Sequence, residues 1–341
     1  MINFKDSCLE KEYSLWYNYL KGSDLMANIA LTSRCNLSCK YCFANELVDS
    51  ATADITMENF IKALEFSLSD GEIGLIGGEP LLHKRINEIL SILISTPEIR
   101  RVTLYTNGIY LNKIKKENIH HKIHFLVNVN SRDDIGEKSF NAVKSNVKDL
   151  LYYTTKDRVT LGVNIYKEKQ DFTDILSMLD ELSFERVRLS VVIPRDKSEG
   201  AFSYFMRMKP TLLSFCMQLG ERGIAPCYDC NAIPECVYTS EEKELLTSLP
   251  YESEHEKRIF MGEASVCAPI VDIYPDMKAS RCFGMSEYKV SIEDFKSIND
   301  LKNHFFMEID SRLVHKASKE QCKECYKQKI FGCFGGCLCY K

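Results

Sequence analysis

The sequence predicts an α/β protein built around a parallel sheet and followed by a cysteine-rich C-terminal region. Short β-branched runs alternate with amphipathic segments from residue 27 to residue 193. The chain has 341 residues, enough for one large domain and a smaller one. Of the fifteen cysteines, all but Cys8 stand in groups, and eleven follow residue 215. These observations place a sheet in the first half and cysteine chemistry at both ends.

Six runs predict the strands, because each is short, apolar and rich in β-branched residues. Helical crossovers between such strands produce a parallel sheet. An open sheet and a curved partial barrel fit this pattern equally well, and in both the ligands bind beyond the C-terminal ends of the strands. The predicted strands are Asn28–Leu31, Ile73–Ile76, Val102–Tyr105, Ile123–Val129, Val159–Ile165 and Val187–Ile193.

Four amphipathic segments between the strands predict helices. The first begins after Thr56, a suitable N-cap, and Gly71 can end it. After Pro194 the alternation stops, although a further helix is expected around residues 209–220. The apolar faces comprise Met57, Phe60, Ile61, Leu64 and Leu68; Ile86, Ile89, Leu90 and Leu93; Phe140, Val143, Val147 and Leu150; and Ile175, Leu179 and Leu182.

Charge and hydropathy exclude several partners. The net charge is −4 and no long Lys/Arg run occurs, so we expect no nucleic-acid partner. No apolar run reaches the roughly 18 residues that a membrane helix needs. The first 20 residues are charged and mixed, unlike a signal peptide. We therefore expect a cytoplasmic protein, in which grouped cysteines more often bind metal than form disulfides.

Cys35, Cys39 and Cys42 form a CxxxCxxC motif directly after the first predicted strand. Thiolates suit zinc and iron–sulfur clusters, and three of them leave one iron of a four-iron cluster open for catalysis. A zinc site completed by a distant residue and unligated core thiols are the alternatives. The turn Gly77–Pro80 (GGEP) follows the second strand, at the same edge of the sheet.

The segment CNLSCKYCF at residues 35–43 resembles the signature of the radical S-adenosylmethionine (SAM) superfamily, and GGEP resembles its SAM-contacting motif. The resemblance covers roughly residues 25–195. It implies a partial (β/α)6 TIM barrel with a SAM-binding [4Fe–4S] cluster, reduced by a partner such as flavodoxin or ferredoxin. It also implies cleavage of SAM to a 5′-deoxyadenosyl radical that takes a hydrogen atom from the substrate.

The resemblance further implies SAM contacts near the mouth of the sheet. Glycines at 77 and 78 allow a ligand to approach the backbone, and Glu79 can accept a hydrogen bond from the SAM ammonium. No catalytic acid, base or hydrogen donor is identified. The expected cofactor contacts are Tyr41, Phe43, Gly77, Gly78, Glu79, Asn107, Asn128, Asn164 and Ser190.

The cysteines of the last 75 residues are too numerous for packing alone and resemble the SPASM extension of radical SAM enzymes, which carries two auxiliary [4Fe–4S] clusters. The expected ligands are Cys267, Cys282, Cys322, Cys325, Cys333, Cys337 and Cys339. The resemblance assigns Cys267, Cys282 and Cys337 to one cluster. It assigns Cys322, Cys325, Cys333 and Cys339 to the other. The expected domains are an N-terminal extension (1–25), the barrel (26–195), a linker or insertion (196–262) and the SPASM-like domain (263–341).

The chain departs from the SPASM pattern at several positions. Met277 replaces the usual glycine, and the gap from Cys325 to Cys333 is longer than usual. The fourth ligand of each auxiliary cluster is therefore open, and a one-cluster twitch domain or a zinc ribbon are alternatives. The cysteines at 227, 230 and 236 have four readings: an auxiliary-cluster ligand, a separate metal site, a thiol that acts on the substrate, and a structural role.

The leading functional hypothesis is modification of a ribosomally made peptide or protein. The roughly 25 residues before the barrel are too few for a leader-peptide-binding domain. Phe283 stands where sulfatase-maturing relatives have an aspartate, which argues against formylglycine formation. Oxidation or rearrangement of a small molecule, such as a sugar or an antibiotic, is the second hypothesis. A non-catalytic iron–sulfur or zinc protein is the third.

Overall fold

A computed structural model describes residues 26–49, 53–193, 199–231, 233–263, 267, 270–329 and 332–341. The predicted N-terminal extension and Cys8 lie outside these residues. The described strands form one sheet of ten strands in the order β10-β9-β8-β1-β2-β3-β4-β5-β6-β7. Its strands are β1 (Ala27–Ala30), β2 (Glu72–Ile76), β3 (Arg101–Thr106), β4 (Ile123–Val129), β5 (Val159–Ile165), β6 (Arg186–Val191), β7 (Ala225–Cys230), β8 (Asp272–Ile273), β9 (Lys278–Ser280) and β10 (Val290–Ser291).

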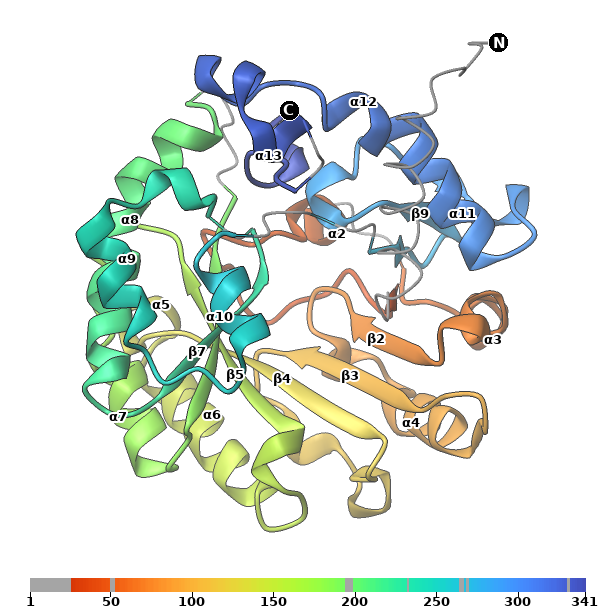
Figure 1. Ribbon diagram of the computed structural model, residues 1–341. Coiled ribbons are helices and arrows are strands. Elements are labelled where there is room, and N and C mark those ends of the chain that lie inside the picture. The colour runs from red at the N-terminus through yellow and green to blue at the C-terminus, as the bar shows by residue number, and fades with distance from the viewer. Residues whose placement is uncertain are drawn as a thin grey trace, which may run out of the picture.

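The six predicted strands are confirmed as β1 to β6, and neighbouring strands pair in parallel throughout. The helices between them lie outside the curved sheet (Figure 1), which makes a partial barrel. The predicted fold class is therefore confirmed. The longer helices are α3 (Met57–Ser67), α4 (Ile86–Ser95), α6 (Glu137–Leu150), α7 (Thr173–Glu181), α8 (Ala201–Gly220), α9 (Ser240–Thr247), α10 (Glu254–Phe260) and α11 (Ile298–Phe305).

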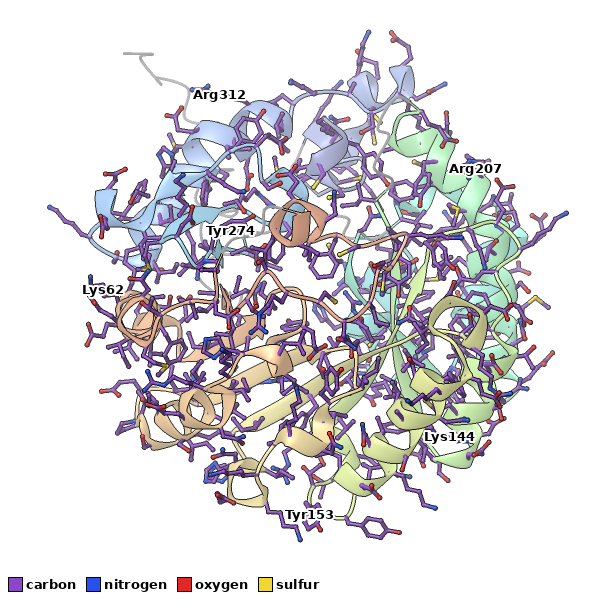
Figure 2. The ribbon with its side chains drawn as sticks, turned by 180° about the vertical axis from the view of Figure 1, so that it is seen from behind. Lys62, Lys144, Tyr153, Arg207, Tyr274 and Arg312 are labelled. Carbon is purple, nitrogen blue, oxygen red and sulfur yellow. The ribbon has the colours of Figure 1, made fainter. Side chains whose placement is uncertain are left out.

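The core lies between the outer face of the sheet and the inner faces of these helices. Thr56 caps α3, because its hydroxyl accepts a hydrogen bond from the backbone N–H of Asn59 at 3.1 Å. Gly71 ends the following turn in the left-handed conformation, with φ of 68°. The charged outer faces point away from the barrel, as Lys62 and Arg207 do near the outline of Figure 2. No described helix is long and apolar enough to span a bilayer.

Strand β7 was not predicted, and it lies within the segment expected to be a linker or insertion. It pairs in parallel with β6 and forms the edge of the sheet. Its sequence, APCYDC, contains Pro226 and few β-branched residues, so it lacks the strand pattern. Proline is tolerated there because an edge strand leaves backbone donors unpaired. Residues 201–230 thus continue the strand–helix series.

The C-terminal segment extends the sheet from its other edge and lies across the barrel mouth (Figure 1). Strand β8 pairs in parallel with β1, and the Asn28 amide donates to the buried Asp272 carboxylate at 2.7 Å. Lys302 on α11 forms a second buried contact, an ion pair of 2.8 Å with Asp70. These contacts fix the cysteine-rich segment to the barrel. Its short helices are α12 (Ser311–Leu313) and α13 (Tyr326–Lys329).

His124 on β4 provides a pH test of this fold. Burial and the charges of Arg101 and Arg158 lower the pKa of His124 to about 4. The unfolded chain takes up this proton near pH 6.5, so stability is fully present above about pH 6.5 and falls as the pH drops toward 4. We expect the free energy of unfolding to fall by about 1 kcal/mol between about pH 7 and pH 5, allowing for solvent screening.

Urea titrations at both pH values measure this effect, and the His124→Gln variant is the control. The variant should lose that part of the pH dependence, since glutamine does not titrate. Equal slopes for the two proteins would exclude His124 as the cause.

Candidate iron–sulfur and SAM site

The motif cysteines lie in the loop that follows β1, at the C-terminal end of the parallel strands. The backbone N–H of Cys42 donates to the carbonyl of Cys39 at 3.1 Å, which closes a tight turn. Burial and the neighbouring charges of Cys42 and Cys35 raise the pKa of Cys39 to about 11. Thiols this close to one another require a positive centre to become thiolates together, and a metal cluster supplies one.

Gly77 and Gly78 pack flat against the backbone that leads into this loop. A Cβ added to Gly77 would stand 2.5 Å from the Thr32 carbonyl oxygen, and φ at Gly77 is +146°. A Cβ added to Gly78 would stand 2.3 Å from the Arg34 carbonyl oxygen. The N–H of Gly78 donates to the Thr32 carbonyl at 2.8 Å. Here the missing side chains allow two loops to touch, a role that the sequence alone did not indicate.

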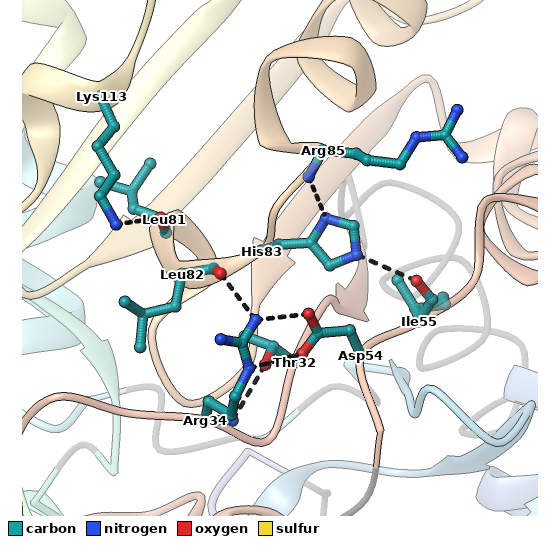
Figure 3. A network of polar contacts seen from close by, with 9 residues as sticks. All are labelled: Thr32, Arg34, Asp54, Ile55, Leu81, Leu82, His83, Arg85 and Lys113. Atoms are coloured by element: carbon teal, nitrogen blue, oxygen red, sulfur yellow. Dashed lines mark hydrogen bonds and ion pairs between the residues drawn. The ribbon is translucent and has the colours of Figure 1, made fainter.

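A polar network supports the same contact from outside (Figure 3). Thr32 donates to Asp54 at 2.6 Å, and Arg34 Nε donates to the same oxygen at 3.0 Å. Arg34 also donates to the Leu82 carbonyl at 2.8 Å. The buried His83 ring lies 3.0 Å from the Ile55 carbonyl oxygen. The start of the cysteine loop, residues 53–55 and the segment after GGEP are thereby held as one unit.

Glu79 is an internal acceptor and is 1% exposed. Its Oε1 accepts from the Leu81 N–H at 3.1 Å and from the Thr106 hydroxyl at 2.8 Å. Its Oε2 accepts from the Asn107 N–H at 2.8 Å. Burial nevertheless raises the pKa of this carboxyl above its ordinary value. The structure therefore uses the carboxylate to join the loops after β2 and β3, and the expected bond to the SAM ammonium stays a prediction.

Asn107 also faces the cysteine loop. Its side-chain amide donates to the Asn36 side chain at 2.9 Å, and its carbonyl oxygen accepts from the Ile109 N–H at 3.1 Å. The loops after β1, β2 and β3 are thus linked through Glu79 and Asn107. A cofactor bound beside Cys35 would therefore contact loops that these hydrogen bonds already hold in place.

The other expected contacts converge on the inner face of the barrel. Asn164 and Ser190 are register partners on β5 and β6. Asn128 on β4 pairs with Gly162, which precedes Asn164 by two residues and so lies on the same face. The buried Asn128 Oδ1 has no hydrogen-bond partner within the described structure. An unsatisfied buried acceptor of this kind suits a ligand hydroxyl or amine.

Tyr41 extends from the cysteine loop toward these strands. Its hydroxyl donates to the Asn130 side chain, and its ring centroid lies 4.7 Å from that of Tyr166. Tyr166 in turn donates to Asp134. Phe43 is 54% exposed, with its ring 5.6 Å from that of Phe283. Asn130 and Tyr166 were not among the predicted site residues. Each follows a predicted contact, Asn128 or Asn164, by two residues.

A first C-terminal set, here the Cys282 group, comprises Cys267, Cys282, Cys337 and Cys339. Interaction with the Cys282 and Cys337 thiols raises the pKa of Cys339, and Cys267 interacts with the charges of Cys282 and Cys337 as well. A Cβ added to Gly284 would stand 2.4 Å from Cys339 Sγ, so this sulfur packs directly against the chain after Cys282. Cys339 therefore does not lie with Cys322, Cys325 and Cys333, where the resemblance had assigned it.

Arg281 lies beside the Cys282 group and is 1% exposed. Its Nη1 donates to Cys267 Sγ at 3.3 Å, and Nη2 donates to the Cys267 carbonyl at 2.7 Å. Asp310 accepts from Arg281 Nε and, at 2.9 Å, from Nη2. Asp310 ends a π-helical turn, Phe306–Asp310, which inserts between α11 and α12. No sequence pattern indicates that these two charges meet.

A second set, here the Cys333 group, comprises Cys322, Cys325 and Cys333. Burial raises the pKa of Cys333, and the charges of Cys322, Cys325 and Cys236 act in the same direction. The Gly335 N–H donates to Cys333 Sγ at 3.2 Å. No disulfide joins any cysteines in the described part of the chain. In that part, no three Cys, His, Asp or Glu side chains converge closely enough to hold a single metal ion.

Comparison with known proteins identifies a protein family whose sequence model this chain matches. Residues 29–189 match the model of the radical SAM superfamily. Among curated proteins, GTP 3′,8-cyclase of Chlorobaculum tepidum is 37% identical over 86 residues, which are 25% of this chain and 26% of that protein. GTP 3′,8-cyclase of Lactiplantibacillus plantarum is 24% identical over 182 residues, 52% of this chain and 48% of that protein. The matches thus span less than half of these relatives.

Among solved structures, SuiB of Streptococcus suis bound to S-adenosylmethionine aligns with a TM-score of 0.59 and 17% identity. The alignment covers 99% of this chain and 80% of that one. SuiB bound to its precursor peptide SuiA aligns with a TM-score of 0.57 and 16% identity, over 99% and 78% of the two chains. At this identity the likeness shows a shared fold, and it includes the cysteine-rich end.

Proposed function

Because the chain belongs to the radical SAM superfamily, we propose that it cleaves SAM reductively and abstracts a hydrogen atom from a peptide or protein substrate. The observation that carries this proposal is the convergence of the three motif thiols with the GGEP turn at the barrel mouth. A reduced cluster bound there supplies the electron that cleaves SAM to methionine and a 5′-deoxyadenosyl radical.

The residues of this chain fit both the [4Fe–4S] cluster and SAM. Cys35, Cys39 and Cys42 would hold the cluster and leave one iron open to SAM. The unsatisfied Asn128 Oδ1 on the inner face would accept a hydrogen bond from the bound cofactor. Tyr41 would border the same space from the loop side. The packed mouth would exclude water from the radical.

A peptide substrate is supported by the structural likeness to SuiB, which extends over nearly the whole chain. One of the SuiB structures is bound to a precursor peptide. The Cys282 and Cys333 groups support auxiliary clusters, since the first brings distant cysteines together and the second gathers three more. The Cys282 group would hold one cluster with four thiolates. Such clusters would accept an electron from the substrate radical or bind the substrate.

Radical chemistry on a small molecule is the second candidate. It is supported by the sequence relatives, which are named GTP 3′,8-cyclases. Their matches are closer in sequence than SuiB but much shorter. Incubation with isotopically labelled GTP tests this candidate directly.

The test of the main proposal is formation of 5′-deoxyadenosine. The anaerobically reconstituted protein, given SAM and dithionite, should release this product, as measured by liquid chromatography and mass spectrometry. The triple variant C35A/C39A/C42A should release none above background. Equal amounts from the two proteins, or none from either, would refute the proposal.

The substrate class needs a second readout. Candidate peptides encoded beside the gene, synthesised with deuterium on carbon, should transfer deuterium to 5′-deoxyadenosine if one of them is the substrate. Deuterium transfer from labelled GTP, with none from the peptides, would favour the second candidate. Both experiments use the same reconstituted enzyme.

A further inference from the structure

The Cys333 group contains three cysteines, whereas an auxiliary four-iron cluster with no open iron requires four ligands. Cys322 and Cys325 flank a short turn, and Cys333 follows after a longer gap. Cys339 is not available to this group because it lies against Cys282 and Cys337. The fourth ligand must therefore come from another segment.

The segment around Cys236 lies beside the Cys333 group. Glu235, its neighbour in sequence, forms an ion pair with Lys327 on α13, the helix that follows Cys325 directly. Lys327 also donates to the Glu263 carbonyl at 3.5 Å. The segments that carry Cys236 and the CxxC turn are thus joined through adjacent residues, although Cys322, the first cysteine of the turn, comes 86 positions after Cys236.

The backbone at Cys236 is held from several sides. Lys209, which is 6% exposed on α8, donates to the Val237 carbonyl at 3.0 Å and to Glu242 at 2.8 Å. A Cβ added to Gly262 would stand 2.2 Å from the Ile233 carbonyl oxygen, so the two backbones touch. A ligand presented on a fixed backbone loses little freedom when it binds metal.

A positive charge also lies at this group. The Lys341 ammonium interacts with Cys322 and Cys333 and donates to the Lys316 carbonyl at 2.5 Å. A [4Fe–4S] cluster with four thiolate ligands carries net negative charge, which a nearby ammonium stabilises. The exposed Cys236 thiol would bind the cluster from its solvent side.

We propose that Cys236 completes the Cys333 group as the fourth ligand of a second auxiliary [4Fe–4S] cluster. This inference rests on the proposed function, which supplies the cluster type. It assigns a ligand from the segment before the cysteine-rich region, in place of the later cysteine that the SPASM pattern uses. The proposal assigns no ligand role to Cys227 and Cys230, which lie in β7.

The test isolates the auxiliary clusters by using the C35A/C39A/C42A background. After anaerobic reconstitution this protein should bind about 8 iron atoms per chain. Adding Cys236→Ala should lower the count, or convert one cluster to a three-iron form with its own EPR signal. If solvent replaces the thiolate, one iron should instead show a distinct Mössbauer doublet.

Cys230→Ala in the same background is the matched control, because it removes another exposed thiol from the same part of the chain. It should retain the full iron count and unchanged spectra. If Cys236→Ala matches Cys230→Ala in iron content, EPR and Mössbauer spectra, the assignment is overturned. Circular dichroism checks that both variants fold.

The outcome is separable from that of the proposed function. Loss of a ligand in Cys236→Ala would support the assignment even if the wild-type protein released no 5′-deoxyadenosine. Conversely, SAM cleavage with unchanged clusters in Cys236→Ala would support the enzyme and overturn the ligand.

Discussion

Replacing Asp310 with asparagine is expected to lower the free energy of unfolding by about 3–5 kcal/mol. Both partners of the Arg281–Asp310 pair are 1% exposed. Asparagine has nearly the same shape but no charge, so the guanidinium would stay buried beside a neutral amide. A buried cation that has lost its counter-ion is destabilising because neither water nor a carboxylate solvates it.

The measurement is the midpoint of urea unfolding under anaerobic conditions. Glu308→Gln is the matched control, since Glu308 lies in the same π-helical turn and pairs with Arg312 at the surface. It should change stability by less than about 0.5 kcal/mol. Similar midpoints for Asp310→Asn and Glu308→Gln would contradict the prediction.

Replacing Glu79 with alanine is the second change with a large expected effect. It removes the acceptor for the N–H groups of Leu81 and Asn107 and for the Thr106 hydroxyl. Each buried donor left without a partner costs about 1–3 kcal/mol, so the sum for three donors is on the order of 3–9 kcal/mol. The loops after β2 and β3 should also separate, and SAM cleavage should fall to background.

Glu79→Gln distinguishes geometry from charge. Glutamine keeps one acceptor oxygen, so it should recover part of the stability and part of the SAM cleavage. Glu88→Gln on α4, whose exposed carboxylate pairs with Arg85, should leave both unchanged. If Glu79→Ala retains wild-type stability and activity, Glu79 does not join these loops as the hydrogen bonds indicate.

The barrel was predictable because its strands and helices carry strong local patterns. The runs at Ile123–Val129 and Val159–Ile165 are strands over the same residues in the structure. Strand β7 was missed since its pairing with β6 depends on tertiary contact and its own sequence is poor in strand formers. Local pattern therefore defined the interior strands better than the edge.

The candidate site was predictable where residues are close in sequence, as in the Cys35–Cys42 loop and GGEP. Its long-range pairings were not. Nothing in the spacing of Cys339 shows that its thiol meets Cys282, 57 positions earlier. Likewise, a GGEP motif does not reveal that the donors to Glu79 come from the loop after the next strand. Such contacts depend on chain path, which periodicity does not record.

The contact between Gly77–Gly78 and Thr32–Arg34 has a mechanical consequence. A Cβ added to either glycine would stand 2.5 Å or less from a carbonyl oxygen of the facing loop, so the two backbones are already in contact. The cysteine loop and the GGEP turn therefore move as one part, and no hinge fits between them. Any widening of the barrel mouth to admit a bulky substrate has to occur elsewhere along the rim.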